Sequence, residues 1–182
     1  MKLWHKEGFS TDKKIETFTI GKDAELDLHL AKWDVLGTLA HAEMLTKIGL
    51  IGQDEWPQLQ RELQAIFSAI ETGNFEIEDG IEDVHSQVEL MLTHKLGDIG
   101  KKVHSGRSRN DQVLVDLKLF FRSEIQEVVE ATQKFFNTLQ SLSEKFKEVL
   151  IPGYTHLQVA MPSSFGLWFG AYAESLIDDV QL

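Results

Sequence analysis

A run of mostly apolar residues between Leu114 and Phe146 constrains the fold more than any other feature of the sequence. Its members follow one another at spacings of three and four: Leu114, Leu117, Phe121, Ile125, Val128, Thr132, Phe135, Leu139, Leu142 and Phe146. This period predicts one helix of roughly 35 residues, about 50 Å long at 1.5 Å per residue. Such a helix needs partners along its whole length, so we expect neighbouring helices or other subunits to cover this seam.

Helical spacing of apolar residues recurs elsewhere in the chain, which contains three prolines. It predicts further helices over residues 26–44, from about Asp54 to Gly73, over 81–96, and from about Pro162 onward. Residues 74–79 form at best a short extended segment, and no strand-like alternation of useful length is visible. The expected fold class is all-α.

Composition limits the classes of partner. Acidic residues number 29 against 18 basic ones, for a net charge of −11, which disfavours nucleic acid and anionic membranes. The absence of cysteine excludes disulfides and thiolate chemistry and fits a reducing compartment. Residues 1–14 lack the apolar core of a signal peptide, and no apolar run approaches the length of a membrane span. We expect a soluble, cytoplasmic protein.

The segment GKKVHSGRSRNDQ, residues 100–112, concentrates positive charge in this acidic chain. Its cations are Lys101, Lys102, Arg107 and Arg109. Ser108 and Asn110 add neutral hydrogen-bonding groups, and the long predicted helix begins just after them with its unpaired N–H groups facing the loop. A helix start beside arginines favours a carboxylate or phosphate site. The alternative is a solvated turn whose cations pair with the protein's own acidic groups.

Two histidine segments are further candidates. In EDVHSQVE, residues 82–89, His85 and Glu89 lie one helical turn apart, which indicates a tautomer-fixing pair, half of a metal site, or only an exposed ion pair. In GYTHLQ, residues 153–158, polar side chains flank His156 in a turn between two apolar helices. A lone histidine in such a turn is more often structural than catalytic.

The order of these segments resembles the argininosuccinate lyase branch of the fumarase/aspartase superfamily. The strings GRSRNDQ and PGYTHLQ carry the resemblance, which extends from about Leu3 through the helix after Pro162. It implies an N-terminal lyase domain, residues 1–112, and the beginning of a central long-helix bundle, residues 113–182. It also implies a homotetramer with active sites where subunits meet, and no cofactor or metal.

The activity implied by the resemblance is the reversible elimination of L-arginine from argininosuccinate to give fumarate, in arginine biosynthesis. His156 matches a histidine with a role in proton transfer, and His85 matches a second histidine near the pocket. The residues that the resemblance implies for substrate binding are Asn110, Thr155, Arg109, Arg107, Ser108, Gln158 and Asp23. In Asp23 this sequence departs from the family, which often has serine there. Val159 and Met161 replace an Arg and a Gln found in many members.

Two alternatives remain open at the level of sequence. One is another fumarate-forming lyase of the superfamily, and the other is a non-catalytic, crystallin-like protein on the same fold. The sequence stops at Leu182 inside a helical pattern, before the family's serine-bearing signature loop. We therefore expect the 182 residues alone to be inactive.

Overall fold

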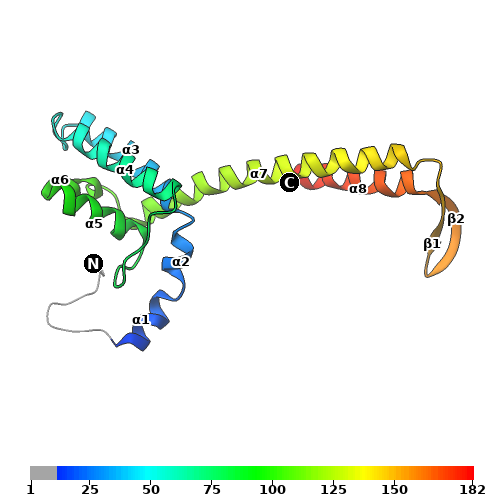
Figure 1. Ribbon diagram of the computed structural model, residues 1–182, viewed down its shortest axis with the longest axis horizontal. Coiled ribbons are helices and arrows are strands. Elements are labelled where there is room, and N and C mark those ends of the chain that lie inside the picture. Colours follow the sequence, from blue (N-terminus) through cyan, green and yellow to red (C-terminus); the bar gives the residue numbers. More distant parts are fainter. Residues whose placement is uncertain (1–11) are drawn as a thin grey trace. The chain divides into compact units, whose positions relative to one another are not determined.

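The computed structural model describes residues 12–182, whose regular elements are helices and one two-stranded hairpin (Figure 1). In chain order the elements are α1 (Lys13–Ile20), α2 (Asp23–Asp27), α3 (Ala31–Lys47), α4 (Trp56–Glu71), α5 (Val84–Leu96), α6 (Asp98–Lys101), the 3₁₀ turn η1 (Lys102–His104), α7 (Arg109–Lys145), β1 (Leu150–Thr155), β2 (Gln158–Ser164) and α8 (Phe165–Val180). The expected all-α class is confirmed. The signal-peptide argument was made about residues 1–14, of which residues 1–11 lie outside the described part.

The chain divides into two compact units, one ending at Phe121 and the other starting at Arg122. The division falls inside α7, whose 37 residues form one continuous helix.

The core of the first unit lies between α3, α4 and α5. In Figure 1, α3 and α4 run side by side, and both contact α5. Their fully buried apolar side chains recur at helical spacing, and they are Ala31, Val35, Ala42, Leu45, Leu59, Leu63, Ile66, Val84, Val88 and Leu92. Burying a large aliphatic side chain stabilises the fold by about 1.5–3 kcal/mol, so this cluster holds the three helices together.

One predicted helix differs from the structure in its start and in its buried face. The helix expected over residues 26–44 is interrupted, because α2 ends at Asp27 and α3 begins at Ala31. Leu26 and Met44, expected on its apolar stripe, are 58% and 40% exposed. Apolar side chains lie on several sides of α3, so the period alone does not select the face that α4 covers.

In the second unit, glycines allow α8 to lie close to α7. Ser143 donates its hydroxyl hydrogen to the Gly166 carbonyl at 2.7 Å, and a Cβ at position 166 would lie 2.7 Å from Lys147 Cα. Ser164 caps α8, since its Oγ accepts the Leu167 N–H at 3.2 Å. This close approach places α8 along the C-terminal part of α7, as Figure 1 shows.

The segment between α7 and α8 is an antiparallel hairpin, which the sequence reading did not predict. Thr155 pairs with Gln158, so the turn consists of His156 and Leu157 alone, at φ 47° and 65°. Two central residues with positive φ are typical of a tight two-residue hairpin turn. The strands were missed because Pro152 and Gly153 interrupt the pattern, and the pairing bulges at that point.

The seam that predicted α7 is largely uncovered within each described unit. Phe121, Ile125, Val128 and Phe135 are each more than half exposed, whereas Leu139 is buried. Despite these apolar side chains, none of the helices in residues 12–182 combines the length and apolarity that a membrane crossing requires.

Candidate active site

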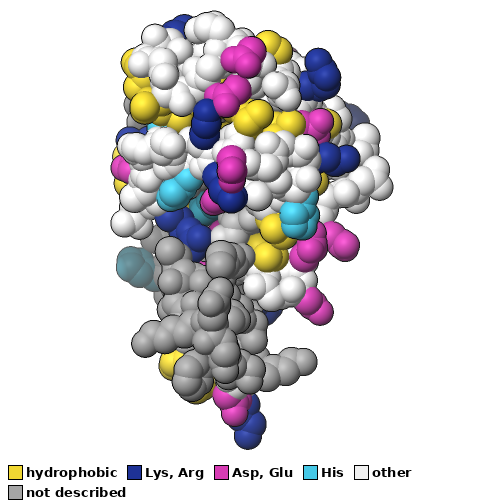
Figure 2. All heavy atoms as spheres, turned by 90° about the vertical axis from the view of Figure 1, so that its left-hand side faces the viewer, with side chains coloured by type: hydrophobic (Ala, Val, Ile, Leu, Met, Phe, Trp, Pro, Cys, Tyr) yellow, Lys and Arg dark blue, Asp and Glu magenta, His cyan; other side chains and the backbone are white. Residues whose placement is uncertain are grey.

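The cations of residues 100–112 are largely paired with acidic groups of the protein. Lys102 contacts Glu55 at 2.6 Å, and Lys101 contacts Asp98 at 2.8 Å. Arg109 contacts Asp83 at 2.7 Å through Nη1 and donates to Ser86 Oγ at 3.0 Å through Nη2. Acidic and basic side chains are also intermixed on the face of the first unit in Figure 2. The loop is therefore not a free basic patch.

Arg107 lies deeper than the other cations of the loop. Its Nη2 donates to Thr38 Oγ1 at 2.9 Å, and its Nε is buried without a partner among the described residues. Burial lowers the pKa of Arg107, and the negative charges of Asp34, Asp116 and Glu89 oppose that shift. A guanidinium stays protonated at neutral pH even so, and it contributes one positive charge to the interior of the first unit.

The start of α7 is closed by its own acidic residue. The Ser108 N–H donates to Asp111 Oδ2 at 2.7 Å, which is a capping-box contact between the residue before the helix and its third residue. Hydrogen bonds from the backbone and the side chain of Ser108 lower the pKa of Asp111. Asn110 is exposed, and its side chain has no hydrogen-bond partner within residues 12–182. It is thus available to a ligand, whereas the helix terminus already holds a carboxylate.

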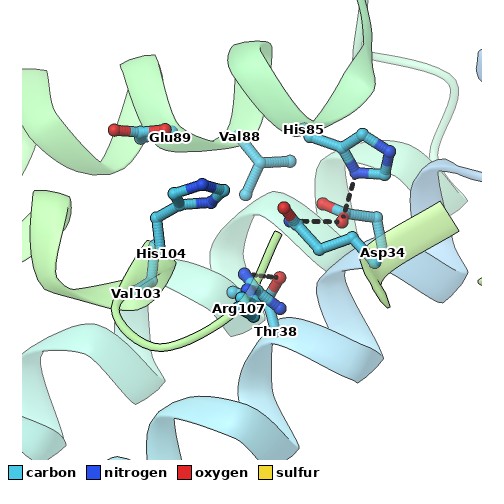
Figure 3. A pocket seen from close by; sticks show the side chains of 9 residues that line it. Asp34, Thr38, His85, Val88, Glu89, Val103, His104 and Arg107 are labelled. Carbon is cyan, nitrogen blue, oxygen red and sulfur yellow. Dashed lines mark hydrogen bonds and ion pairs between the residues drawn. The ribbon is translucent and has the colours of Figure 1, made fainter. Parts of the chain in front are cut away.

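A buried polar cluster of four side chains lies between α3, α5 and α7. His85 Nδ1 is 2.7 Å from Asp34 Oδ1 and 3.7 Å from Asp116 Oδ2. Gln112 Nε2 donates to the same Asp34 oxygen at 3.3 Å. Figure 3 shows the His85 imidazole directed at Asp34, with Arg107 and Thr38 nearby. The expected pairing of His85 with Glu89 is wrong, because the histidine points across the core to a different helix.

Burial and charge shift two pKa values in this cluster. Burial disfavours the imidazolium, but the hydrogen bond to Asp34 and the charges of Asp34, Asp83 and Asp116 outweigh it, so the pKa of His85 is raised. Burial first, and then the like charge of Asp34, raise the pKa of Asp116 to about 7, although His85 and Arg107 act in the opposite direction. Both groups therefore keep their protons up to a higher pH than they do in water.

The same cluster borders a cavity of ≈ 10 Å³, lined also by Thr38, Glu89 and His104. That volume accommodates about one water molecule, which is far below the several hundred Å³ of an ordinary substrate pocket. Ligand atoms of Asp34, His85 and Asp116 lie within 4.8 Å of one another. The neighbouring Arg107 charge and the hydrogen bond that already occupies Nδ1 disfavour a metal ion there, and a shared proton satisfies the same atoms.

The second candidate histidine lies at the tip of the hairpin. His156 occupies the first position of the two-residue turn, and Thr155 and Gln158 are the paired residues on either side of it. All three side chains are exposed, and none has a side-chain hydrogen bond in the described part of the chain. The hairpin therefore brings these three predicted site residues together and leaves them free. Strand β2, which begins at Gln158, also carries Val159 and Met161, and these side chains are 68% and 63% exposed.

Asp23 and Asp27 lie near one another on α2 but differ in surroundings. Asp23 begins the helix and is exposed. Asp27 Oδ2 accepts the Val84 N–H at 3.2 Å, at the start of α5. Burial raises the pKa of Asp27, while that hydrogen bond and His85 act against the shift. Asp27 thus lies close to the predicted His85 site, although the sequence reading selected Asp23.

Sequence reasoning missed most partners of His85. Asp34 and Thr38 are one turn apart on α3, and Gln112 and Asp116 are one turn apart on α7. All four lie on buried faces among apolar neighbours. Polar pairs at a spacing of four on a core-facing stripe are the signal that points to such a cluster.

Residues 7–182 match the lyase family, and the chain belongs to that family. Argininosuccinate lyases are among its close relatives in sequence. The one from Bacteroides thetaiotaomicron is 63% identical over 180 residues, which cover 99% of this chain and 40% of that protein. The one from Parabacteroides distasonis is 64% identical over 181 residues, again 40% of its length. The chain thus spans about 40% of the length of these relatives.

Solved structures agree on the fold. A fumarate lyase:delta crystallin from Brucella melitensis superposes with a TM-score of 0.74 at 18% identity, covering 93% of this chain and 42% of that one. An EDDS lyase with bound fumarate gives 0.70 at 23% identity, covering 96% of this chain and 34% of that one. At these identities the likeness supports the helical architecture alone.

Proposed function

We propose that the chain is the N-terminal portion of an argininosuccinate lyase, a carbon–nitrogen lyase that reversibly eliminates L-arginine from argininosuccinate to give fumarate. The observation that carries the proposal is 63% identity to the Bacteroides thetaiotaomicron enzyme of that name, sustained over 99% of the chain. The family resemblance of the two motif segments points in the same direction.

The elimination requires removal of a proton next to a carboxylate and protonation of the departing guanidino nitrogen. Each step needs a positioned acid or base, and the charge that develops on the carboxylate needs hydrogen-bond donors. His156 supplies proton transfer in this proposal, with Thr155 and Gln158 beside it as substrate contacts. Their exposed, unpaired side chains at the hairpin tip support these roles.

In the first unit, Asn110 and Ser108 contact substrate at the start of α7, and Asp23 contacts its cationic end. Arg107 and Arg109 shape this loop from behind, through Thr38 and through Asp83 and Ser86. Since Arg107 Nη2 and both Nη groups of Arg109 already bond within the protein, the two arginines position Asn110 more than they bind the substrate.

The complete enzyme is proposed to be a cytoplasmic homotetramer, with an N-terminal domain over residues 1–112 and a bundle domain that begins at residue 113. Two findings support assembly from several copies. The α7 seam exposes large apolar side chains, and the cavity beside His85 is too small for the substrate. The 182 residues alone are accordingly proposed to be inactive.

A chimeric lyase tests the proposed function. It joins this 182-residue chain to the remaining part of the Bacteroides thetaiotaomicron enzyme in place of the matched residues. We expect the chimera to release fumarate from argininosuccinate, measured by ultraviolet absorbance, but not from adenylosuccinate, aspartate or malate. His156→Asn in the chimera should abolish turnover while its circular dichroism stays unchanged. A chimera that folds and yields no fumarate from argininosuccinate contradicts the proposal.

The same assay covers two alternative functions. Fumarate released from one of the other three substrates would assign the chain to another lyase of the superfamily. A folded assembly without turnover on any of them would indicate a crystallin-like structural role, which is the other alternative left open by the sequence.

A further inference from the structure

His85 is held by one of its two ring nitrogens. Nδ1 lies 2.7 Å from Asp34 Oδ1, and both side chains are buried, at 5% and 1% exposure. The described residues offer Nε2 no hydrogen bond. A hydrogen bond at one nitrogen of an imidazole fixes the ring's orientation and decides which protons it carries. The second nitrogen is therefore the atom left for a ligand.

The elements packed around His85 supply an excess of negative charge. Asp34 on α3 and Asp116 on α7 face the ring at 2.7 and 3.7 Å. Asp83, at the start of α5, and Asp27 on α2 interact with it at longer range. Arg109 pairs with Asp83 and so neutralises that carboxylate.

Above pH 7, the charges balance only when the imidazole carries a second proton. Asp116 has a pKa of about 7 and is mostly ionised there, so Asp34 and Asp116 bring two negative charges, while Arg107 brings one positive charge. A neutral His85 leaves a net buried negative charge, which is costly in a site of low dielectric constant. An imidazolium removes that excess and gives Asp34 a charged hydrogen-bond donor.

We propose that Asp34 is a positioning residue for His85: it holds the ring as an imidazolium with Nδ1–H on Asp34, so that Nε2–H is a fixed cationic donor for a carboxylate ligand. This role rests on the proposed function for the identity of the ligand, because argininosuccinate and fumarate are polycarboxylates. Nε2–H then acts on the substrate as a hydrogen-bond donor with positive charge, and proton removal falls to other groups. Asp116 supplies the second negative charge, and Gln112 orients Asp34 through its amide.

The test measures the protonation of His85 directly, in the 182-residue chain labelled with ¹⁵N-histidine. Both ring nitrogens of His85 should carry protons at pH 7.5, as their ¹⁵N shifts report. Asp34→Asn keeps the shape and removes the charge, and should lower the proton affinity of His85 by about tenfold or more. Asp34→Glu should restore most of that affinity. The exposed pair Lys101–Asp98 provides the matched control, Asp98→Asn, which should leave the His85 titration unchanged.

A second arm uses succinate as the probe, at pH 7.5, in the chimeric lyase, because the cavity beside His85 in the single chain holds only about one water molecule. Its addition should shift the Nε2–H signal of His85 in the unmodified chimera and much less in the chimera that carries Asp34→Asn. A neutral His85 at pH 7 in the unmodified chain overturns the proposal, and so does an unchanged titration in a folded Asp34→Asn variant. Broadening of the His85 signals by micromolar Mn²⁺ also overturns it, because the cluster would then bind a metal ion.

The two proposals fail in different ways. If the chimeric lyase makes no fumarate while His85 titrates and responds to succinate as described, the proposed function is wrong and the role of Asp34 stands. If the chimera is active while His85 is neutral, the proposed function stands and the role of Asp34 is wrong.

Discussion

Arg109 Nη1 lies 2.7 Å from Asp83 Oδ2, while Asp83 Oδ1 accepts the Ser86 N–H at the start of α5. One carboxylate thus caps α5 and anchors the first residue of α7. Because Arg109 also donates to Ser86 Oγ, the planar guanidinium ties the two helix starts through two different groups. This contact joins two of the three sequence segments from which the candidate site was predicted, residues 82–89 and 100–112.

Arg109→Ala should destabilise the protein by about 1–3 kcal/mol, since the buried Asp83 carboxylate is left without its cation. Urea unfolding followed by circular dichroism measures the change. Lys101→Ala is the matched control, because the Lys101–Asp98 pair is exposed at 60% and 93% and such pairs contribute below about 1 kcal/mol. Equal losses in the two variants would show that the Arg109 contact has no special weight.

Asp116 makes stability depend on pH near neutrality. Its folded-state pKa of about 7 lies above the pKa of 3.8 of an unperturbed aspartate, so the folded protein holds an extra proton between these two pH values. The stability linked to that proton is fully present below about pH 4 and is lost as pH rises through about 7. The raised pKa of His85 acts in the same direction, since its stabilising proton is lost as pH rises through the folded-state value.

Asp116→Asn cannot ionise, so its melting temperature should fall less between pH 5.5 and pH 8 than that of the unmodified chain, as a thermal scan at each pH reports. Asp111→Asn is the control. The pKa of Asp111 is lowered, so its contribution is lost only as pH falls below the ordinary range of a carboxyl. A pH slope that Asp116→Asn leaves unchanged would assign the proton to another group.

Gly166→Ala should loosen the contact between α7 and α8. The added Cβ would lie 2.7 Å from Lys147 Cα and 2.9 Å from the Ser143 carbonyl oxygen, and relief requires movement of backbone. We expect a loss of about 1–3 kcal/mol, measured by thermal unfolding. Gly170→Ala, one turn later, meets Ser143 Oγ only at 3.6 Å and should gain about 0.5–1 kcal/mol from helix propensity. Similar effects at the two positions would argue against close packing at Gly166.

Leu157→Gly should strengthen the hairpin. Leu157 has φ 65° and is 99% exposed, so its side chain contributes strain and no packing within this chain. Left-handed backbone costs a residue with Cβ about 1–2 kcal/mol, part of which is offset by the entropy of an unfolded glycine. Amide hydrogen exchange in β1 and β2 should slow several-fold. Val159→Gly, at an exposed strand position, should accelerate exchange instead, and acceleration in both variants would contradict this account.

Charges on the α7 seam should block assembly. Ile125 and Val128 are each 62% exposed, which is unusual for large apolar side chains on one helix stripe. The double variant Ile125→Glu, Val128→Glu in the chimeric lyase should sediment as a species smaller than the tetramer. Glu130→Lys changes an exposed charge away from the seam and should leave the tetramer intact. A tetramer that survives the double variant would place the subunit contact elsewhere.

Local chemistry in the sequence determined the helices and the candidate residues. A three-four spacing without prolines from Leu114 to Leu142 predicted the helix α7, and the strings around Asn110 and His156 carried the resemblance to the family. These features are readable because they depend on neighbours within a few residues.

Only the tertiary structure decided which groups meet. His85 could pair with Glu89 by spacing, yet it binds Asp34, which lies 51 positions away in the chain. The arginines of the loop were expected to face a ligand, and they are engaged by Thr38, Asp83 and Ser86 instead. Likewise, the hairpin depends on hydrogen bonds between Leu150 and Ser164 and their neighbours, which no local period encodes. Charge pairing and strand pairing act across space, so a one-dimensional pattern names the participants but leaves their partners undetermined.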